Sequence, residues 1–299
     1  MKYLLPVIAL APGFAAPLAA QESEPPAEIE ATAAVTLPDN SVKQSNRLSA
    51  NVGTGLVTEY ISRGVLFAKE VSLQPQITVT LDLPSLEGGA ITGANVFVGS
   101  WSSIKLGPVP SGSGGRLTRF YETDLYAGAA IELADRWAVS GTYYRYESLG
   151  NSFAGYNDFE VIVSFDDTGM WDNNISPAFS LSPSLRLVQE AGRPGRKDAL
   201  YIQPSLTPSF DTRLGNTKIN LAFPIVVGLS DEYYDGTDGG KKTFGFFRTG
   251  MIVSGKPAPR AAPGLTLSGG FDLWVPNSEV KSGLDQYDVV GRIGLDWSL

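Results

Sequence analysis

Hydrophobic and polar residues alternate with a period of two along most of this chain, and residues 119–147 show the pattern most clearly. Leu125 falls on an apolar face of that stretch, whereas Glu122 and Asp124 fall on the opposite, polar face. Because successive side chains of a β-strand point to opposite faces, the pattern predicts two strands joined by a turn at residues 134–136. Each arm is roughly 11 to 13 residues long, enough for a tilted strand to cross a bilayer.

The same alternation recurs from residue 47 to the end of the chain, and with the first hairpin it predicts twelve strands and no crossover helix. The other ten runs cover residues 48–60, 73–82, 91–101, 158–165, 179–187, 200–207, 218–227, 244–254, 265–273 and 288–299. The twelve runs are numbered along the chain, with the two arms of residues 119–147 as the fourth and fifth. Polar and mostly long segments follow the odd-numbered runs, and mostly shorter segments follow the even-numbered runs. Long loops at one rim and short turns at the other are typical of outer-membrane barrels. We therefore expect an all-β fold, a closed antiparallel transmembrane β-barrel with up-and-down topology.

A soluble β-sandwich would also alternate, so strand length and targeting have to separate the two folds. Three features favour lipid: long strands, an N-terminal export signal, and a last strand that carries Trp297. Aromatic residues near strand ends are expected at the two membrane interfaces. These are Tyr60, Trp101, Trp137, Tyr143, Phe165, Phe210, Trp274 and Trp297.

Prolines inside the predicted strands argue that some strands are interrupted, because proline removes a hydrogen bond from the ladder. Strand boundaries between residues 178 and 254 are therefore the least defined by sequence. The prolines concerned are Pro75, Pro183, Pro204, Pro208 and Pro224.

The first 46 residues read as an export signal followed by a flexible segment. Residues 1–20 carry one Lys, an apolar run and small residues before Ala20, which predicts a secretory signal peptide. Residues 21–46 are rich in Glu, Pro, Ala and Thr without periodicity, which predicts a flexible segment. Residues 47–299 form the predicted barrel, and we expect it in the bacterial outer membrane.

Composition excludes several classes of function. The chain has 299 residues with no Cys and no His, so thiol catalysis, histidine-based hydrolysis and most metal sites are not expected. The net charge of −8 makes nucleic acid an unsuitable partner, because phosphate binding needs basic patches. We expect no enzyme activity and no cofactor.

Several short motifs resemble those of the TorF-like family of bacterial outer-membrane porins, over roughly residues 49–165. The matching residues are Tyr60, Arg63 and Gly64 at the end of the first strand, Pro75-Gln76 in the next strand, Trp101 within Gly-x-Trp-x-Ser, Gly128 at the end of Glu-x-Asp-x-Tyr-x-Gly, and the Tyr144-x-Tyr146 pair. The resemblance implies an outer-membrane barrel and a channel, but no established substrate.

Within the family motif, Gly64 is expected to supply a positive φ or a close backbone approach where the first strand ends. Arg63 is expected to pair with a carboxylate of the rim or lumen, and these motif residues are expected to be structural.

The polar strand faces supply candidate pore-lining residues of both signs. They are Glu122, Asp124, Glu160, Arg186, Lys218, Arg248, Asp272, Arg292 and Asp296. Opposed charges across a lumen form a constriction that selects solutes by size and charge. The expected function is passive diffusion of small hydrophilic solutes or ions through a barrel surrounded by outer-membrane lipid. The alternatives are a non-conducting barrel that acts as a scaffold or surface-binding protein, and a soluble secreted β-sandwich binding module. The sequence leaves the solute, the ion selectivity and the oligomeric state open.

Overall fold

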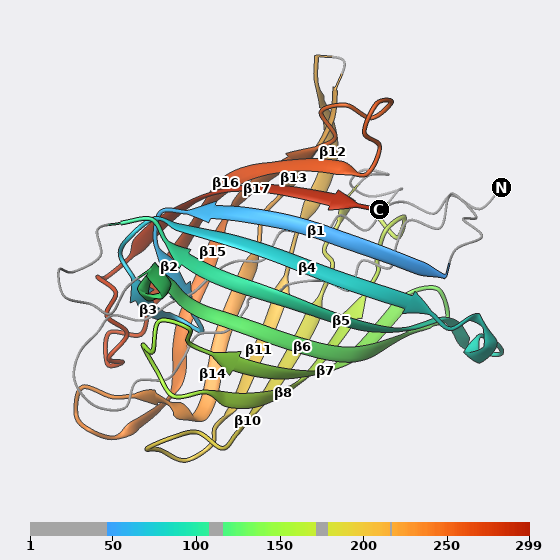
Figure 1. Ribbon diagram of the computed structural model, residues 1–299. Coiled ribbons are helices and arrows are strands. Elements are labelled where there is room, and N and C mark those ends of the chain that lie inside the picture. Colours follow the sequence, from blue (N-terminus) through green and yellow to red (C-terminus); the bar gives the residue numbers. More distant parts are fainter. Residues whose placement is uncertain (1–46, 108–115, 172–178, 216) are drawn as a thin grey trace.

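The chain forms a closed antiparallel β-barrel, seen in the computed structural model, which describes residues 47–107, 116–171, 179–215 and 217–299 (Figure 1). Fifteen strand segments form one sheet, and three pairs of them are successive pieces of one strand, which leaves twelve strands round the ring. Up-and-down neighbours pair throughout, and the pairing of β1 with β17 joins the two ends of the chain. The segments are β1 (Leu48–Val57), β4 (Ser72–Asp82), β5 (Ile91–Lys105), β6 (Phe120–Leu133), β7 (Trp137–Glu147), β8 (Tyr156–Phe165), β9 (Phe179–Ser180) with β10 (Ser184–Ala191), β11 (Leu200–Leu206) with β12 (Ser209–Leu214), β13 (Thr217–Ala222) with β14 (Ile225–Asp235), β15 (Lys241–Gly255), β16 (Leu265–Pro276) and β17 (Asp288–Ser298).

Closure of the ring has a simple physical reason. Each of the twelve strands pairs with a neighbour on both sides over at least part of its length, so the ring has no open edge. In hydrocarbon each unpaired group costs several kcal/mol, so a sheet that meets lipid has to close. The predicted twelve-stranded barrel is confirmed, and a two-sheet sandwich is not the fold of this chain.

Prolines interrupt three of the strands. Pro183 separates β9 from β10 beside Ser182, whose φ is +46°, Pro208 separates β11 from β12, and Pro224 separates β13 from β14. The predicted interruption is confirmed at these three positions. Pro75 and Pro204 lie inside β4 and β11, which continue through them, although the β4–β5 ladder skips Pro75 and the β11–β14 ladder skips Pro204.

The two faces of the wall differ in the way that the alternation predicts. On β6, Leu125 faces outward with 54% of its surface exposed, whereas the neighbouring Glu122 and Asp124 are fully buried inside. Outward-facing apolar residues continue from strand to strand, because the register places Val52 beside Ile77 and Leu267 beside Leu295. Exposed large apolar side chains on the strands include Val52, Leu56, Ile77, Leu81, Val96, Val98, Leu125, Tyr143, Phe159, Val161, Leu185, Leu206, Ile225, Leu267, Phe271, Val289, Ile293 and Leu295.

Three of the aromatic residues expected at the membrane interfaces lie inside the barrel instead. Tyr60, Trp101 and Trp274 are buried, and their rings pack against other lumen residues. The inner face of a twelve-stranded barrel has to be filled or wetted, and large aromatic rings fill it. Trp137, Tyr143, Phe210 and Trp297 are exposed on the outside, as expected for interfacial residues, and Phe165 is partly exposed.

The segment after the first strand is not the rim loop that the sequence predicts. The expected run to Tyr60 ends earlier, since β1 stops at Val57. The chain then forms a two-stranded hairpin, β2 (Tyr60–Ser62) and β3 (Val65–Ala68), outside the barrel sheet. Apart from Val65, which is half-buried, every residue of these two strands is buried. We call residues 60–68 the lumen hairpin. It lies at the end of the barrel opposite the C-terminus (Figure 1).

Short 3₁₀ turns are the only helical segments among the described residues: η1 (Pro84–Leu86) and η2 (Arg116–Arg119). Within the same residues, no helix has the length and apolar character needed to cross a membrane. The predicted signal peptide (1–20) and flexible segment (21–46) lie outside the described residues.

Candidate functional site

The tip of the lumen hairpin is a two-residue turn made by the Arg63-Gly64 pair. Both residues have positive φ, +41° for Arg63 and +76° for Gly64, between Ser62 and Val65, which pair with each other. Positive φ at both central positions is the geometry of a type I′ turn, whose twist matches that of the flanking strands. Gly64 is needed for a second reason, because a Cβ there would overlap the ring of Phe246 on β15. Gly64 thus has both properties that its sequence position suggests.

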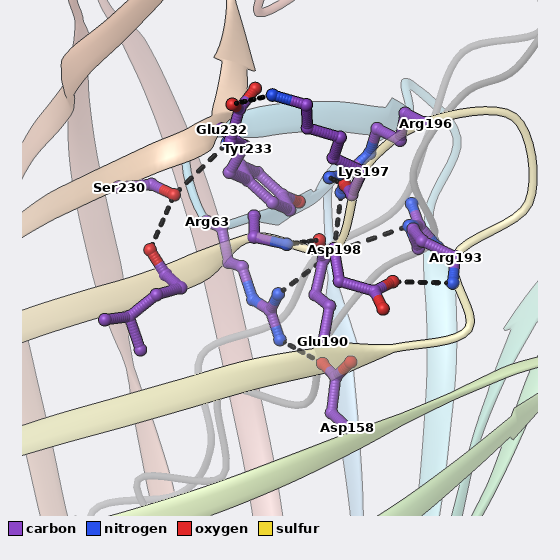
Figure 2. A network of polar contacts seen from close by, with 12 residues as sticks. Arg63, Asp158, Glu190, Arg193, Arg196, Lys197, Asp198, Ser230, Glu232 and Tyr233 are labelled. Carbon is purple, nitrogen blue, oxygen red and sulfur yellow. Dashed lines mark hydrogen bonds and ion pairs between the residues drawn. The ribbon is translucent and has the colours of Figure 1, made fainter.

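Arg63 reaches the far wall of the barrel. Its Nη2 lies 2.5 Å from Asp158 Oδ2 on β8, and its Nη1 lies 3.6 Å from Glu190 Oε1 on β10 (Figure 2). In the strand order, β10 is the sixth strand from β1 in either direction round the ring, so it stands opposite the strand from which the hairpin emerges. The lumen hairpin therefore spans the lumen from one wall to the other.

Arg63 is fully buried, yet its charge is well supported. Its guanidinium carbon lies 5.1 Å from the ring centre of Tyr201 and 5.2 Å from that of Tyr233, within the range of a cation–π contact. Burial alone would lower the pKa of Arg63, but Asp158, the two phenols Tyr233 and Tyr146, and Glu190 outweigh it and hold the pKa above its usual value. The guanidinium is a permanent cation in this setting.

Glu190 is the centre of the network that receives Arg63. Its Oε1 is 2.6 Å from Arg196 Nη2 and 3.4 Å from Arg193 Nε, and its Oε2 accepts a hydrogen bond of 2.9 Å from the Ala199 N–H (Figure 2). Arg193 also stacks 4.1 Å from the ring centre of Tyr156. One carboxylate thus holds three guanidinium groups from the loop and the hairpin, and the β10–β11 loop folds over the far end of Arg63.

The root of the lumen hairpin is held by the near wall. The Tyr60 hydroxyl donates a hydrogen bond of 3.2 Å to Glu122 Oε2 on β6, and its ring lies 5.5 Å from that of Trp101 on β5. The Leu66 N–H donates to the Ser282 carbonyl, 2.7 Å away in the β16–β17 loop. Contacts on several sides of the ring hold the hairpin in one position.

Away from the hairpin, the predicted lumen charges pair with one another. Arg186 Nε is 2.5 Å from Glu160 Oε2, and Tyr144 donates a hydrogen bond of 3.2 Å to Glu160 Oε1. Arg292 Nη1 lies 3.0 Å from Asp272 Oδ2. Arg248 Nη1 lies 3.9 Å from the other Asp272 oxygen, and its guanidinium lies 5.0 Å from the centre of the Trp274 ring.

Two predicted lumen residues sit closer to solvent. Asp296 accepts a hydrogen bond of 3.1 Å from Gln76 Nε2 and is partly buried. Lys218 pairs with Asp211 at 2.7 Å near the turn between β12 and β13, with 58% of its side chain exposed, so it lies at the rim and not among the buried charges. Whether any of these residues lines a path for solute stays a prediction.

The structure adds a group of site residues that were not among the sequence-based candidates. They are Asp158, Glu190, Arg193, Arg196, Tyr201 and Tyr233. Asp158 lies two positions from Glu160 on one strand, and Glu190 lies four positions from Arg186 on another. The alternation therefore predicts that both carboxylates point into the barrel. Their partner, Arg63, could not be predicted, because it belongs to a hairpin that emerges from the opposite side of the ring.

Comparisons with known proteins give no family for this chain. No family model matches it, so the resemblance to TorF-like porins is not supported there, and no curated protein matches it. Solved structures with a similar course are the COG4313 outer-membrane channel from Pseudomonas putida F1 (6% identity, 86% of this chain and 97% of that one, TM-score 0.49) and the NanC porin (11% identity, 84% and 100%, TM-score 0.45). The β-domain of the Bordetella autotransporter BrkA is also similar (10% identity, 85% and 99%, TM-score 0.41). At these identities and TM-scores, the likenesses assign no function to this chain.

Proposed function

We propose that this protein is an outer-membrane channel for small hydrophilic solutes or ions, narrowed by the lumen hairpin. The observation that carries the proposal is the inverted surface of the barrel, which is apolar outside and charged inside. In a soluble protein a continuous outer belt of Val, Leu, Ile and Phe would be a large exposed apolar patch, which monomers in water rarely tolerate. In a membrane the apolar belt contacts lipid instead of water, so its exposure is not unfavourable. Residues 1–20 would direct the chain to the envelope.

The lumen supports passage of polar solutes but also limits it. Ion pairs such as Arg186 with Glu160 and Arg292 with Asp272 present charges of both signs to the interior. Charged side chains that face each other across a lumen select solutes by the width they leave open and by the electric field between them. The lumen hairpin occupies part of the same cross-section, so we propose a low conductance for the native protein.

Single-channel recording in planar bilayers tests the proposal. The native protein is compared with a variant in which residues 58–71 are replaced by a short Gly-Ser connection, which leaves every strand of the barrel in place. We expect small conductance steps from the native protein and larger ones from the hairpin-free variant. Heat-modifiable gel mobility of both proteins shows that each barrel has folded.

The packing round the lumen hairpin favours one second candidate, a non-conducting barrel that presents its loops as a scaffold or binding surface. Tyr60, Arg63 and Phe67 of the hairpin are completely buried, as are Tyr146 and Tyr201 of the facing walls. If neither the native nor the hairpin-free protein conducts while both are folded, the channel proposal is wrong; a partner that binds through the loops would then establish the scaffold.

A further inference from the structure

Two adjacent acidic residues of the lumen are buried without an arginine or lysine partner among the described residues. Glu122 and Asp124 lie two positions apart on β6, so both point to the inner face, and both are completely buried. Their carboxyl groups are within hydrogen-bonding reach of each other. With both groups ionised there is no donor hydrogen between them, so the contact would bring two acceptors and two negative charges together.

The surrounding cations do not neutralise this pair. Among the described residues, no Arg or Lys nitrogen comes within ion-pair distance of Glu122 or Asp124, whereas Asp158, Glu160, Glu190 and Asp272 each have an arginine. Tyr60 donates one hydrogen bond to Glu122 Oε2, but Glu122 Oε1 and both oxygens of Asp124 accept none. A buried charge without a partner is costly, so a further group has to compensate this one.

Two neutral polar side chains on the adjoining strands, those of Ser103 and Gln74, face the same place and have no hydrogen-bond partner. Ser103 on β5 pairs in register with Glu122, and Trp101 pairs with Asp124. Gln74 on β4 falls beside Ser103, between the registered pairs Leu73–Ile104 and Gln76–Trp101. Gln74 is 1% exposed and Ser103 is 0% exposed. The amide nitrogen and oxygen of Gln74 have no hydrogen-bond partner, and the Ser103 hydroxyl has none either.

Buried side-chain amides and hydroxyls almost always have partners, so a group of them without any points to a ligand. The available atoms are mostly oxygens: two carboxylates, one amide oxygen and one hydroxyl in adjoining rows of the wall. This donor set suits a hard cation such as Ca²⁺, which takes carboxylate, amide and hydroxyl oxygens together with water. No group of three or more acidic residues converges among the described residues, so the neutral oxygens are essential to the site.

We propose that Glu122, Asp124, Gln74 and Ser103 form a binding site for a hard cation of the Ca²⁺ type on the near wall of the lumen. The site lies at the root of the lumen hairpin, because Tyr60 is hydrogen-bonded to Glu122. A bound cation therefore stabilises the wall to which the hairpin is attached. The inference does not depend on conduction, so it stands or falls separately from the channel proposal.

Terbium luminescence of the full-length, detergent-folded protein tests the site. Tb³⁺ is used as a Ca²⁺ analogue, and Trp101, which faces Asp124 in the register, is the expected sensitiser. We expect a saturable emission on excitation of tryptophan that Ca²⁺ displaces and K⁺ at the same concentration does not. Asp124→Asn should weaken Tb³⁺ binding at least tenfold. Asp296→Asn, which alters a lumen acid already bonded to Gln76, is the matched control and should not change it.

A second pair of variants covers the case in which Asp124→Asn does not fold. Gln74→Ala with Ser103→Ala removes only the neutral oxygens and should also weaken binding, while Trp101→Phe should abolish the sensitised emission and leave Ca²⁺ binding by calorimetry in place. Absence of saturable emission and of calorimetric Ca²⁺ binding in the native protein would overturn the proposal. So would equal binding in the native, Asp124→Asn and Gln74→Ala/Ser103→Ala proteins. In either case the two carboxyl groups share a proton instead.

Discussion

Replacing Arg63 with Met should release the lumen hairpin from the far wall of the barrel. The substitution keeps an unbranched apolar side chain but removes the guanidinium that pairs with Asp158 and Glu190 and stacks on two tyrosine rings. Glu190 keeps Arg193 and Arg196, whereas Asp158 is left buried without the arginine. Breaking a buried pair by removing one partner costs about 3–5 kcal/mol. Loss of the cation–π contacts adds to that.

This cost falls on docking of the hairpin and not on the barrel, because Arg63 takes no part in the ladder between wall strands. Since about 1.4 kcal/mol corresponds to a factor of ten, the population of undocked hairpin should rise on the order of 100- to 4,000-fold. The chain has no Cys, so a single introduced thiol can report this change. Leu66 of β3 is buried, and Leu66→Cys places the thiol on the hairpin.

The assay is the rate at which a bulky maleimide labels Leu66→Cys in folded protein, with and without Arg63→Met. Arg145→Met in the same background is the control, because its pair with Glu147 is exposed and worth at most about 1 kcal/mol. Adding Asp158→Asn to Arg63→Met should recover part of the slow labelling, since it removes the orphaned charge. Equal labelling rates with and without Arg63→Met would show that Arg63 does not hold the hairpin.

Three further substitutions test the turn, the position of the hairpin and the outer face. Gly64→Ala should loosen the hairpin in the same labelling assay, because a positive φ of +76° and the Phe246 ring both oppose a Cβ; Gly89→Ala, at a φ of +60° with open space around it, should not. Leu66→Cys with Gly283→Cys should form a disulfide, since a Cβ built at Gly283 lies 3.4 Å from that of Leu66, close to the usual spacing. The φ of +71° at Gly283 strains any side chain there, so Gly283→Ala is the control for that cost. If the channel opens by hairpin movement, the oxidised form should conduct less than the reduced form; identical conductance would mean that the hairpin stays in place during conduction. Val98→Arg, at the centre of β5 with 57% of its surface exposed, should destabilise the barrel in lipid by about 2–4 kcal/mol in urea titrations. Leu149→Arg, in the β7–β8 loop with 50% exposed, should have little effect, and equal effects of the two would contradict a lipid-facing belt.

The alternation of apolar and polar side chains along the sequence predicted most of the fold. Leu125 outside and Asp124 inside follow from the pleat of one strand, a property that each residue shares only with its neighbours along the chain. The same rule gave the inward direction of Glu160, Arg186 and Asp272 without any knowledge of their partners. The proline interruptions were predictable for the same reason, since the missing N–H is a local feature, but at Pro75 and Pro204 the strand continues and only the pairing with one neighbouring strand is lost.

The lumen hairpin could not be predicted in this way. Its residues read as the end of one strand and the start of a polar loop, and Tyr60 looked like an interfacial aromatic. Its position depends on Asp158, which is 95 positions away, and on Glu190, Tyr201 and Tyr233 beyond it. These residues meet Arg63 only because ring closure brings β10 opposite β1.

The sequence by itself therefore determined the strands, their count, the two faces of the wall and the exclusion of cysteine and histidine chemistry. The tertiary structure alone decided that the first connection turns inward and spans the lumen. It also decided which buried carboxyl groups among the described residues have an arginine partner and which, at Glu122 and Asp124, do not. The physical reason is the range of the forces: the pleat and the missing proline N–H act within a few residues. The compensation of a buried charge depends on whatever the closed barrel brings within a few ångströms.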